Sequence, residues 1–141
     1  MTWAYPVRER KVLGQLKLTG EQIALTAARA ADDKRGSGIV VLDLRDISLM
    51  TDYFVIVDAS SEAQVRAITE GIQEALEAEG VAAYRREGWE DARWVLLDYG
   101  DAVVHIFRTE DREYYDLERL WGDAPRLILN ETQEALVLET R

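Results

Sequence analysis

The clearest pattern in this sequence is a pair of nearly continuous apolar runs in its first half. IVVLDL occupies residues 39–44 and YFVIVD occupies residues 53–58, and both runs are rich in valine and isoleucine. Apolar runs without polar alternation are typical of strands that are covered on both faces. We therefore expect two central strands of a sheet, joined by the turn segment RDISLMTD at 45–52.

Helical periodicity appears in three other segments. The first two, at 19–33 and 61–79, each open with a hydroxyl residue followed three positions later by glutamine, which is the spacing of a capping box. The capping pairs are Thr19 with Gln22 and Ser61 with Gln64. Gly80 follows the second segment in the position of a C-terminal glycine cap. A third helix is expected from about Glu110 to Trp121, because acidic residues fill its first turn.

The stretch WVLLDYGDAVVHIF at 94–107 predicts a β-hairpin. A tight turn at Tyr99-Gly100 would place Asp98 opposite Asp101, and side chains would alternate between two faces. One face is purely apolar and should lie against a helix: Val95, Leu97, Ala102, Val104 and Ile106. The other face is mixed: Trp94, Leu96, Asp98, Asp101, Val103 and His105.

These elements, together with VAAYRRE at 81–87, predict an α/β fold in which a mixed β-sheet of about five strands is flanked by helices. Residues 19–121 then form a single domain. Residues 1–18 are expected to be an N-terminal arm and residues 122–141 a C-terminal tail, which could hold a short strand or helix or be loosely attached.

The charge balance narrows the choice of partner. The chain has 17 basic and 27 acidic residues, which gives a formal net charge of −10. Extensive nucleic-acid binding usually depends on lysine and arginine, so this composition argues against it and favours a basic partner. The sequence contains no cysteine, no apolar run long enough to cross a bilayer and no signal-peptide pattern at its N-terminus, which agrees with the cytoplasmic location that we expect.

The mixed face of the hairpin allows two interpretations of equal weight on composition. It is either a half-exposed sheet face or a protein-binding patch with aromatic anchors and an acidic rim. A metal site at Asp98, Asp101 and His105 is disfavoured, because the chain offers no second histidine and no cysteine. The acidic and hydroxyl side chains at 43–52 are better explained as turn formers: Asp43, Asp46, Thr51 and Asp52. Phosphate-binding loops and nucleophile elbows are absent, so we expect no enzyme activity, no metal and no cofactor.

Three sequence blocks carry a family resemblance: VVLDLRDISLMTDYFVIVDASS at 40–61, WVLLDYGDAVVHIF at 94–107 and YYDLERLW at 114–121. Together, and in this order, they resemble the ribosomal silencing factor family, also called the Iojap family. The resemblance covers roughly residues 21–121 and depends on no single short motif.

The resemblance implies a function that composition does not reveal. Family members bind the large ribosomal subunit through ribosomal protein fourteen, block joining of the small subunit and thereby repress translation. They are described as homodimers when free. Their fold resembles nucleotidyltransferases, but the Asp-x-Asp metal pair of that superfamily is absent here, so its activity is not expected. The implied partner-binding residues are Trp94, Asp98, Tyr99, Asp101, Tyr115 and Glu118.

Two alternatives stay open from the sequence. One is a dimeric adaptor for another basic protein. The other is a nucleotidyltransferase-like protein that binds a nucleotide near the acidic side chains of residues 43–52.

Overall fold

The computed structural model of the 141-residue chain describes residues 18–129 and 135–139. The N-terminal arm expected at 1–18 therefore lies outside the described residues, apart from Leu18. The helices are α2 (Gly20–Asp33), α3 (Glu62–Ala78), α4 (Thr109–Tyr115) and α5 (Leu117–Leu120). The strands are β1 (Ser37–Asp43), β2 (Tyr53–Ala59), β3 (Arg85–Glu87), β4 (Trp94–Asp98), β5 (Ala102–Arg108), β6 (Arg126–Leu129) and β7 (Ala135–Glu139).

The strands form one mixed seven-stranded sheet in the order β3-β4-β5-β2-β1-β6-β7. Only the central pair of β2 and β5 is parallel, and every other neighbouring pair is antiparallel. The expected mixed sheet flanked by helices is therefore confirmed. The sheet exceeds the expected size because β6 and β7, from the segment 122–141, extend it beyond β1.

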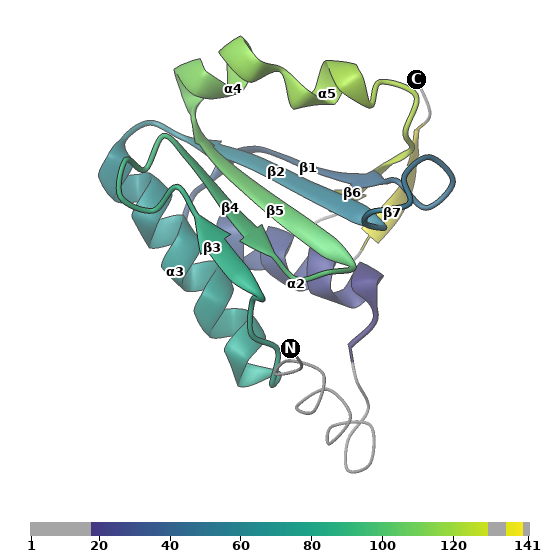
Figure 1. Ribbon diagram of the computed structural model, residues 1–141, viewed down its shortest axis with the longest axis horizontal. Helices are drawn as coiled ribbons and strands as arrows, with labels where there is room; N and C mark the ends of the chain where they lie inside the picture. The colour runs from purple at the N-terminus through teal and green to yellow at the C-terminus, as the bar shows by residue number, and fades with distance from the viewer. Residues whose placement is uncertain (1–17, 130–134, 140–141) are drawn as a thin grey trace.

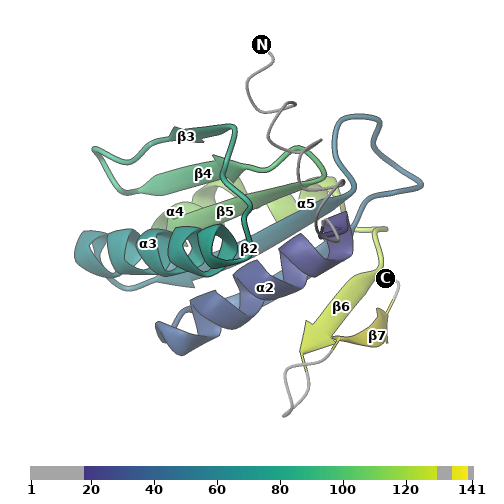
Figure 2. The same cartoon turned by 90° about the horizontal axis from the view of Figure 1, so that it is seen from below.

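Helices cover both faces of the sheet unequally (Figures 1 and 2). The long helices α2 and α3 pack side by side on one face, and the short helices α4 and α5 cross the other. The main core lies under α2 and α3, where Val55, Val104, Ile68 and Ile72 are fully buried. A smaller core lies under α4 and α5, around Leu42, Ile56 and Phe107. The second face thus leaves part of the sheet open to solvent.

Both predicted helix starts are confirmed. The Thr19 side chain accepts a hydrogen bond from the Gln22 backbone N–H, and the Gln22 side chain accepts one from the Thr19 N–H. Ser61 caps α3 in the same way, whereas the Gln64 side chain accepts from the Ser60 N–H instead of closing the box. These bonds satisfy amide donors that the first turn of a helix leaves unpaired.

The predicted register of the hairpin is wrong by one residue at the turn. Trp94 pairs with Phe107 and Asp98 with Val103, so the two-residue loop is Gly100-Asp101 and the two aspartates are not opposite each other. Gly100 has φ +83°, and a two-residue hairpin loop of this kind requires glycine at its first position. The two predicted faces survive this correction, because shifting the turn by one residue changes the pairing by two.

The predicted last helix is divided in two. Asp116 adopts the left-handed conformation with φ 48° and ψ 55°, and it separates α4 from α5. Aspartate tolerates this conformation better than most residues, which is why the chain can turn there.

Candidate functional site

An aromatic cluster occupies the sheet face that α4 and α5 partly cover. The Trp94 ring lies 5.0 Å from the Phe107 ring, its partner in the β4–β5 ladder, and 4.6 Å from the ring of Tyr115 at the end of α4. His105 lies on the same face of β5, with its ring 4.5 Å from that of Phe54 in β2. Trp94 is half-buried and Tyr115 is 47% exposed, so this cluster reaches the surface.

The two polar rings of the cluster are hydrogen-bonded to each other. The Trp94 Nε1–H donates to His105 Nδ1 over 3.0 Å. Indole nitrogen is a donor only, so this bond requires an unprotonated Nδ1 and leaves the imidazole proton on Nε2. Burial lowers the pKa of His105 to about 4, which keeps the imidazole neutral at physiological pH. The buried Nε2 has no hydrogen-bond partner among the described residues.

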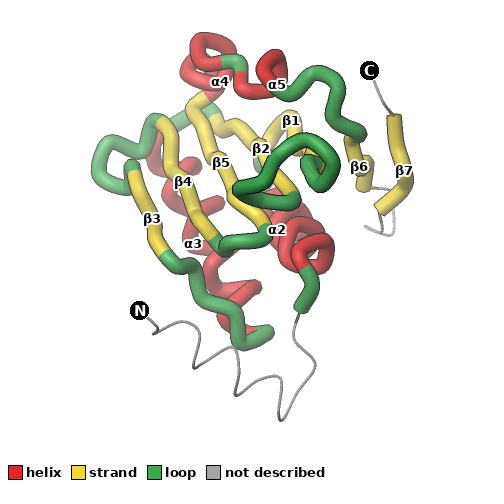
Figure 3. Tube along the Cα trace, turned by 45° about the vertical axis from the view of Figure 1, so that its right-hand side comes forward, coloured by secondary structure: helices red, strands yellow, loops and turns green. Residues whose placement is uncertain are grey.

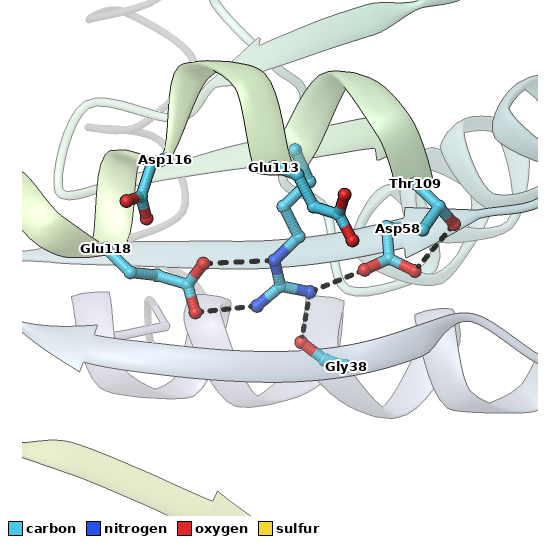
Figure 4. A pocket seen from close by; sticks show the side chains of 7 residues that line it. Gly38, Asp58, Thr109, Glu113, Asp116 and Glu118 are labelled. Carbon is cyan, nitrogen blue, oxygen red and sulfur yellow. Dashed lines mark hydrogen bonds and ion pairs between the residues drawn. The ribbon is translucent and has the colours of Figure 1, made fainter.

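A charged cluster beside the aromatic one fixes α4 and α5 to the sheet. The Arg112 guanidinium donates to both carboxylate oxygens of Glu118, to Asp58 over 2.9 Å and to the Gly38 carbonyl over 2.6 Å. Figure 4 shows these groups around an open depression of about 470 Å³. Its lining includes four carboxylates and one guanidinium: Asp58, Arg112, Glu113, Asp116 and Glu118. Glu118 therefore lines the depression and also forms an ion pair with Arg112.

Three expected site residues lie at the hairpin turn, and their surroundings differ: Asp98, Tyr99 and Asp101. Asp98 accepts hydrogen bonds from the Arg85 Nε over 3.1 Å and from the Gly100 N–H over 2.8 Å. Asp101 is half-buried, and its carbonyl accepts from the Asp52 N–H. Tyr99 is only 3% exposed and packs in the main core. Burial raises the pKa of its phenol well above the ordinary value.

The expected site residues therefore do not form a single contiguous surface. Trp94 and Tyr115 are in contact, whereas Glu118 lies in α5 and pairs with Arg112. Asp98 stands four residues further along β4, about 13 Å away at 3.3 Å per residue. The side chain of Tyr99 cannot act as an exposed contact, because alternation along β4 directs it to the same side as Val95 and Leu97.

Sequence reasoning missed an apolar surface at the turn end of the sheet. The loop between β1 and β2, drawn green in Figure 3, exposes three large apolar residues: Ile47 at 44%, Leu49 at 105% and Met50 at 89%. It joins the hairpin turn through the bond from Asp52 to Asp101. The sequence signal for this surface was the apolar content of residues 47–50, which lie between turn-forming side chains. The turn-forming role of Asp43 is confirmed, since its carboxylate accepts from the Arg45 N–H over 3.1 Å.

The described part of the chain contains no group of three or more histidine, aspartate or glutamate side chains that could hold a metal ion. Within the same residues, no helix is long and apolar enough to cross a membrane. The fold and the surface together define a mixed α/β domain with an aromatic cluster that reaches the surface at Trp94 and Tyr115.

Comparison with known proteins identifies the family. The model of the family described as "Ribosomal silencing factor during starvation" matches residues 17–140, and the chain belongs to this family. The resemblance drawn from the three sequence blocks is confirmed, and the match also includes the strands β6 and β7.

Individual relatives agree with this assignment. The chain is 48% identical over 105 residues to "Ribosomal silencing factor RsfS" of Bacillus subtilis, covering 74% of this chain and 89% of that protein. It is 43% identical over 112 residues to the protein of the same name from Halalkalibacterium halodurans, covering 79% and 96%. A crystal structure of a protein from Chromobacterium violaceum superimposes with a TM-score of 0.72 at 34% identity, covering 74% of this chain and 88% of that one. The expected likeness to nucleotidyltransferases stays a prediction.

Proposed function

We propose that this protein binds the large ribosomal subunit through ribosomal protein fourteen, sterically blocks joining of the small subunit and so represses translation. Membership of the ribosomal silencing factor family supports a role in silencing ribosomes. The observation that carries the binding mode is the contact between Trp94 and Tyr115, two aromatic side chains that reach the surface from different elements. Partly buried aromatic side chains of this kind are the usual anchors of protein–protein interfaces.

Charge supports a basic partner. The net charge is −10, and three of the expected site residues are half-buried acids: Asp98, Asp101 and Glu118. An acidic protein is repelled by ribosomal RNA and attracted by the lysine and arginine of a ribosomal protein. We therefore propose that Trp94 and Tyr115 supply most of the binding energy, and that Asp98, Asp101 and Glu118 accelerate and orient docking. Tyr99 would support the turn from the core.

Steric repression requires no chemistry. A bound protein occupies space that the small subunit needs, so we propose a regulator that is not an enzyme and uses no cofactor. A ribosomal target also implies a cytoplasmic location. For the free protein we propose a homodimer, which would have to leave its docking surface accessible or dissociate to bind.

Sedimentation with separated ribosomal subunits tests this function. The protein should travel with large subunits and not with small ones, and its presence should reduce the formation of whole ribosomes when both are mixed. Binding that depends on charge should weaken as salt is raised. If the protein stays at the top of the gradient, the proposal fails, and an adaptor for another basic protein becomes the better explanation.

A further inference from the structure

We infer that His105 is a positioning residue for docking: it accepts the Trp94 indole N–H and thereby holds the indole in the orientation that the ribosomal partner contacts. The docking part of this inference rests on the proposed function. The hydrogen bond itself is independent of any partner and can be tested alone.

Strand register makes this bond a fixed feature of the sheet. Trp94 stands opposite Phe107, whereas His105 stands opposite Leu96, one pair further along the same face. The indole therefore reaches diagonally across the ladder to His105 Nδ1, at 3.0 Å, while its ring stays stacked on Phe107. Diagonal neighbours on one face lie within reach of an aromatic side chain.

His105 is suited to this task because it is itself held firmly. The residue is 4% exposed, and the rings around it are those of Phe54, Trp94 and Phe107. Phe54 belongs to β2, so the imidazole is enclosed by three strands. Burial keeps it neutral, and a neutral imidazole with its proton on Nε2 always offers Nδ1 as an acceptor.

The orientation of Trp94 would otherwise be free to change. The indole is half-buried, with Phe107 beneath it and Tyr115, itself 47% exposed, beside it. Without an acceptor in the sheet, the indole N–H would be stabilised by turning toward water, which would move the ring away from these neighbours. The bond to His105 therefore fixes which part of the tryptophan the surface presents.

The hydrogen bond can be tested on the unaltered protein by nuclear magnetic resonance. The sequence contains a single histidine, so its imidazole signals need no assignment by mutation. In ¹⁵N-labelled protein at pH 7, Nδ1 should give the signal of an unprotonated acceptor and Nε2 that of a protonated nitrogen. A scalar coupling through the hydrogen bond should join Nδ1 to the Trp94 indole nitrogen. A protonated Nδ1, or no coupling, overturns the inference.

Two variants then connect the bond to docking. His105→Asn keeps an acceptor oxygen near the position of Nδ1, whereas His105→Phe keeps an aromatic ring and removes the acceptor. We expect His105→Phe to bind isolated large subunits roughly fivefold to tenfold more weakly, as for the loss of one hydrogen bond, and His105→Asn to recover most of this loss. Folded His105→Phe that binds as tightly as the unaltered protein overturns the positioning role.

The variant Trp94→Ala separates failure of the inference from failure of the proposed function. If Trp94→Ala binds large subunits normally, the docking surface is elsewhere and the proposed binding mode fails. If Trp94→Ala binds weakly while His105→Phe binds normally, the docking surface stands and only the role of His105 is refuted.

Discussion

Arg112 and Glu118 face each other across the break between α4 and α5, joined by hydrogen bonds of 3.1 and 2.9 Å from one guanidinium to one carboxylate. The same guanidinium reaches Asp58 in β2 and the Gly38 carbonyl in β1. One side chain thus ties both short helices to the centre of the sheet. Because Tyr115 ends α4, this tie also sets the place of its ring beside Trp94.

Arg112→Met should destabilise the fold. The change removes a guanidinium that pairs with two carboxylates whose side chains are only 12% and 22% exposed, those of Asp58 and Glu118. We expect a loss of about 2 to 3 kcal/mol in the free energy of unfolding, measured by urea denaturation. Arg45→Met is the control, because the Arg45 side chain is 57% exposed in its ion pair with Asp43, whereas the Arg112 side chain is only 12% exposed. That variant should lose less than about 1 kcal/mol, and equal losses would contradict the role of Arg112.

The protein should become less stable as the pH is lowered, because His105 titrates at a lower pH in the folded state than in the unfolded state. Its pKa is about 4 in the folded protein against 6.5 for the free side chain, so below pH 6.5 the unfolded state takes up a proton that the folded state does not. The contribution is complete above pH 6.5 and is lost progressively down to pH 4. Between pH 7.5 and pH 5 we expect His105 to account for a loss of about 2 kcal/mol.

His105→Asn is the comparison that isolates this titration. Asparagine does not ionise, so the variant should lose about 2 kcal/mol less than the unaltered protein over the same interval, as measured by urea denaturation at both pH values. Parallel losses in the two proteins would show that the histidine is not kept neutral by the fold.

Gly100→Ala should destabilise the hairpin. The residue has φ +83°, and an added Cβ would lie 2.8 Å from the Tyr84 ring. We expect a loss of about 1 to 2 kcal/mol. At Gly122 an added Cβ meets only ordinary contacts, the nearest at 3.5 Å, so Gly122→Ala should change stability little. A neutral Gly100→Ala would refute the left-handed backbone conformation of Gly100.

Tyr115→Ala should weaken ribosome binding without unfolding the protein. Its ring stands beside Trp94, and truncation of an interface anchor reduces affinity by about tenfold or more. The neighbouring Tyr114 is the matched control, because it is 79% exposed and its ring packs edge-on against that of Tyr115. Tyr114→Ala should bind large subunits within about twofold of the unaltered protein. The reverse order of effects would move the docking surface to the outer side of α4.

Local signals in the sequence were sufficient for most of the fold. The cap at Thr19, the glycine at Gly80 and the apolar runs of β1 and β2 each depend on neighbouring residues, and each was confirmed. The turn register was missed because glycine suits either position of a two-residue loop, and only the pairing of β4 with β5 decides between them. The break at Asp116 was missed because the helical period continues through it.

The candidate site was predictable only in part, for a different reason. Trp94 and Tyr115 lie on separate elements, and no sequence pattern indicates how α4 packs on the sheet to bring the two rings together. The burial of Tyr99 follows from strand alternation with Val95 and Leu97, but the family resemblance had placed it on the surface. Leu49 and Met50 belong to a segment that was interpreted as a turn, so their exposed apolar side chains were not predicted.

The central claim is that the aromatic face around Trp94 docks on the large ribosomal subunit, and the most direct test compares two tryptophan variants. Trp89 lies in the loop between β3 and β4 under the Arg86 guanidinium, 4.1 Å from it, and outside the proposed surface. Affinity for isolated large subunits should fall about thirtyfold, equivalent to about 2 kcal/mol, in folded Trp94→Ala and should be unchanged in Trp89→Ala. Equal affinities for Trp94→Ala and the unaltered protein would contradict the account.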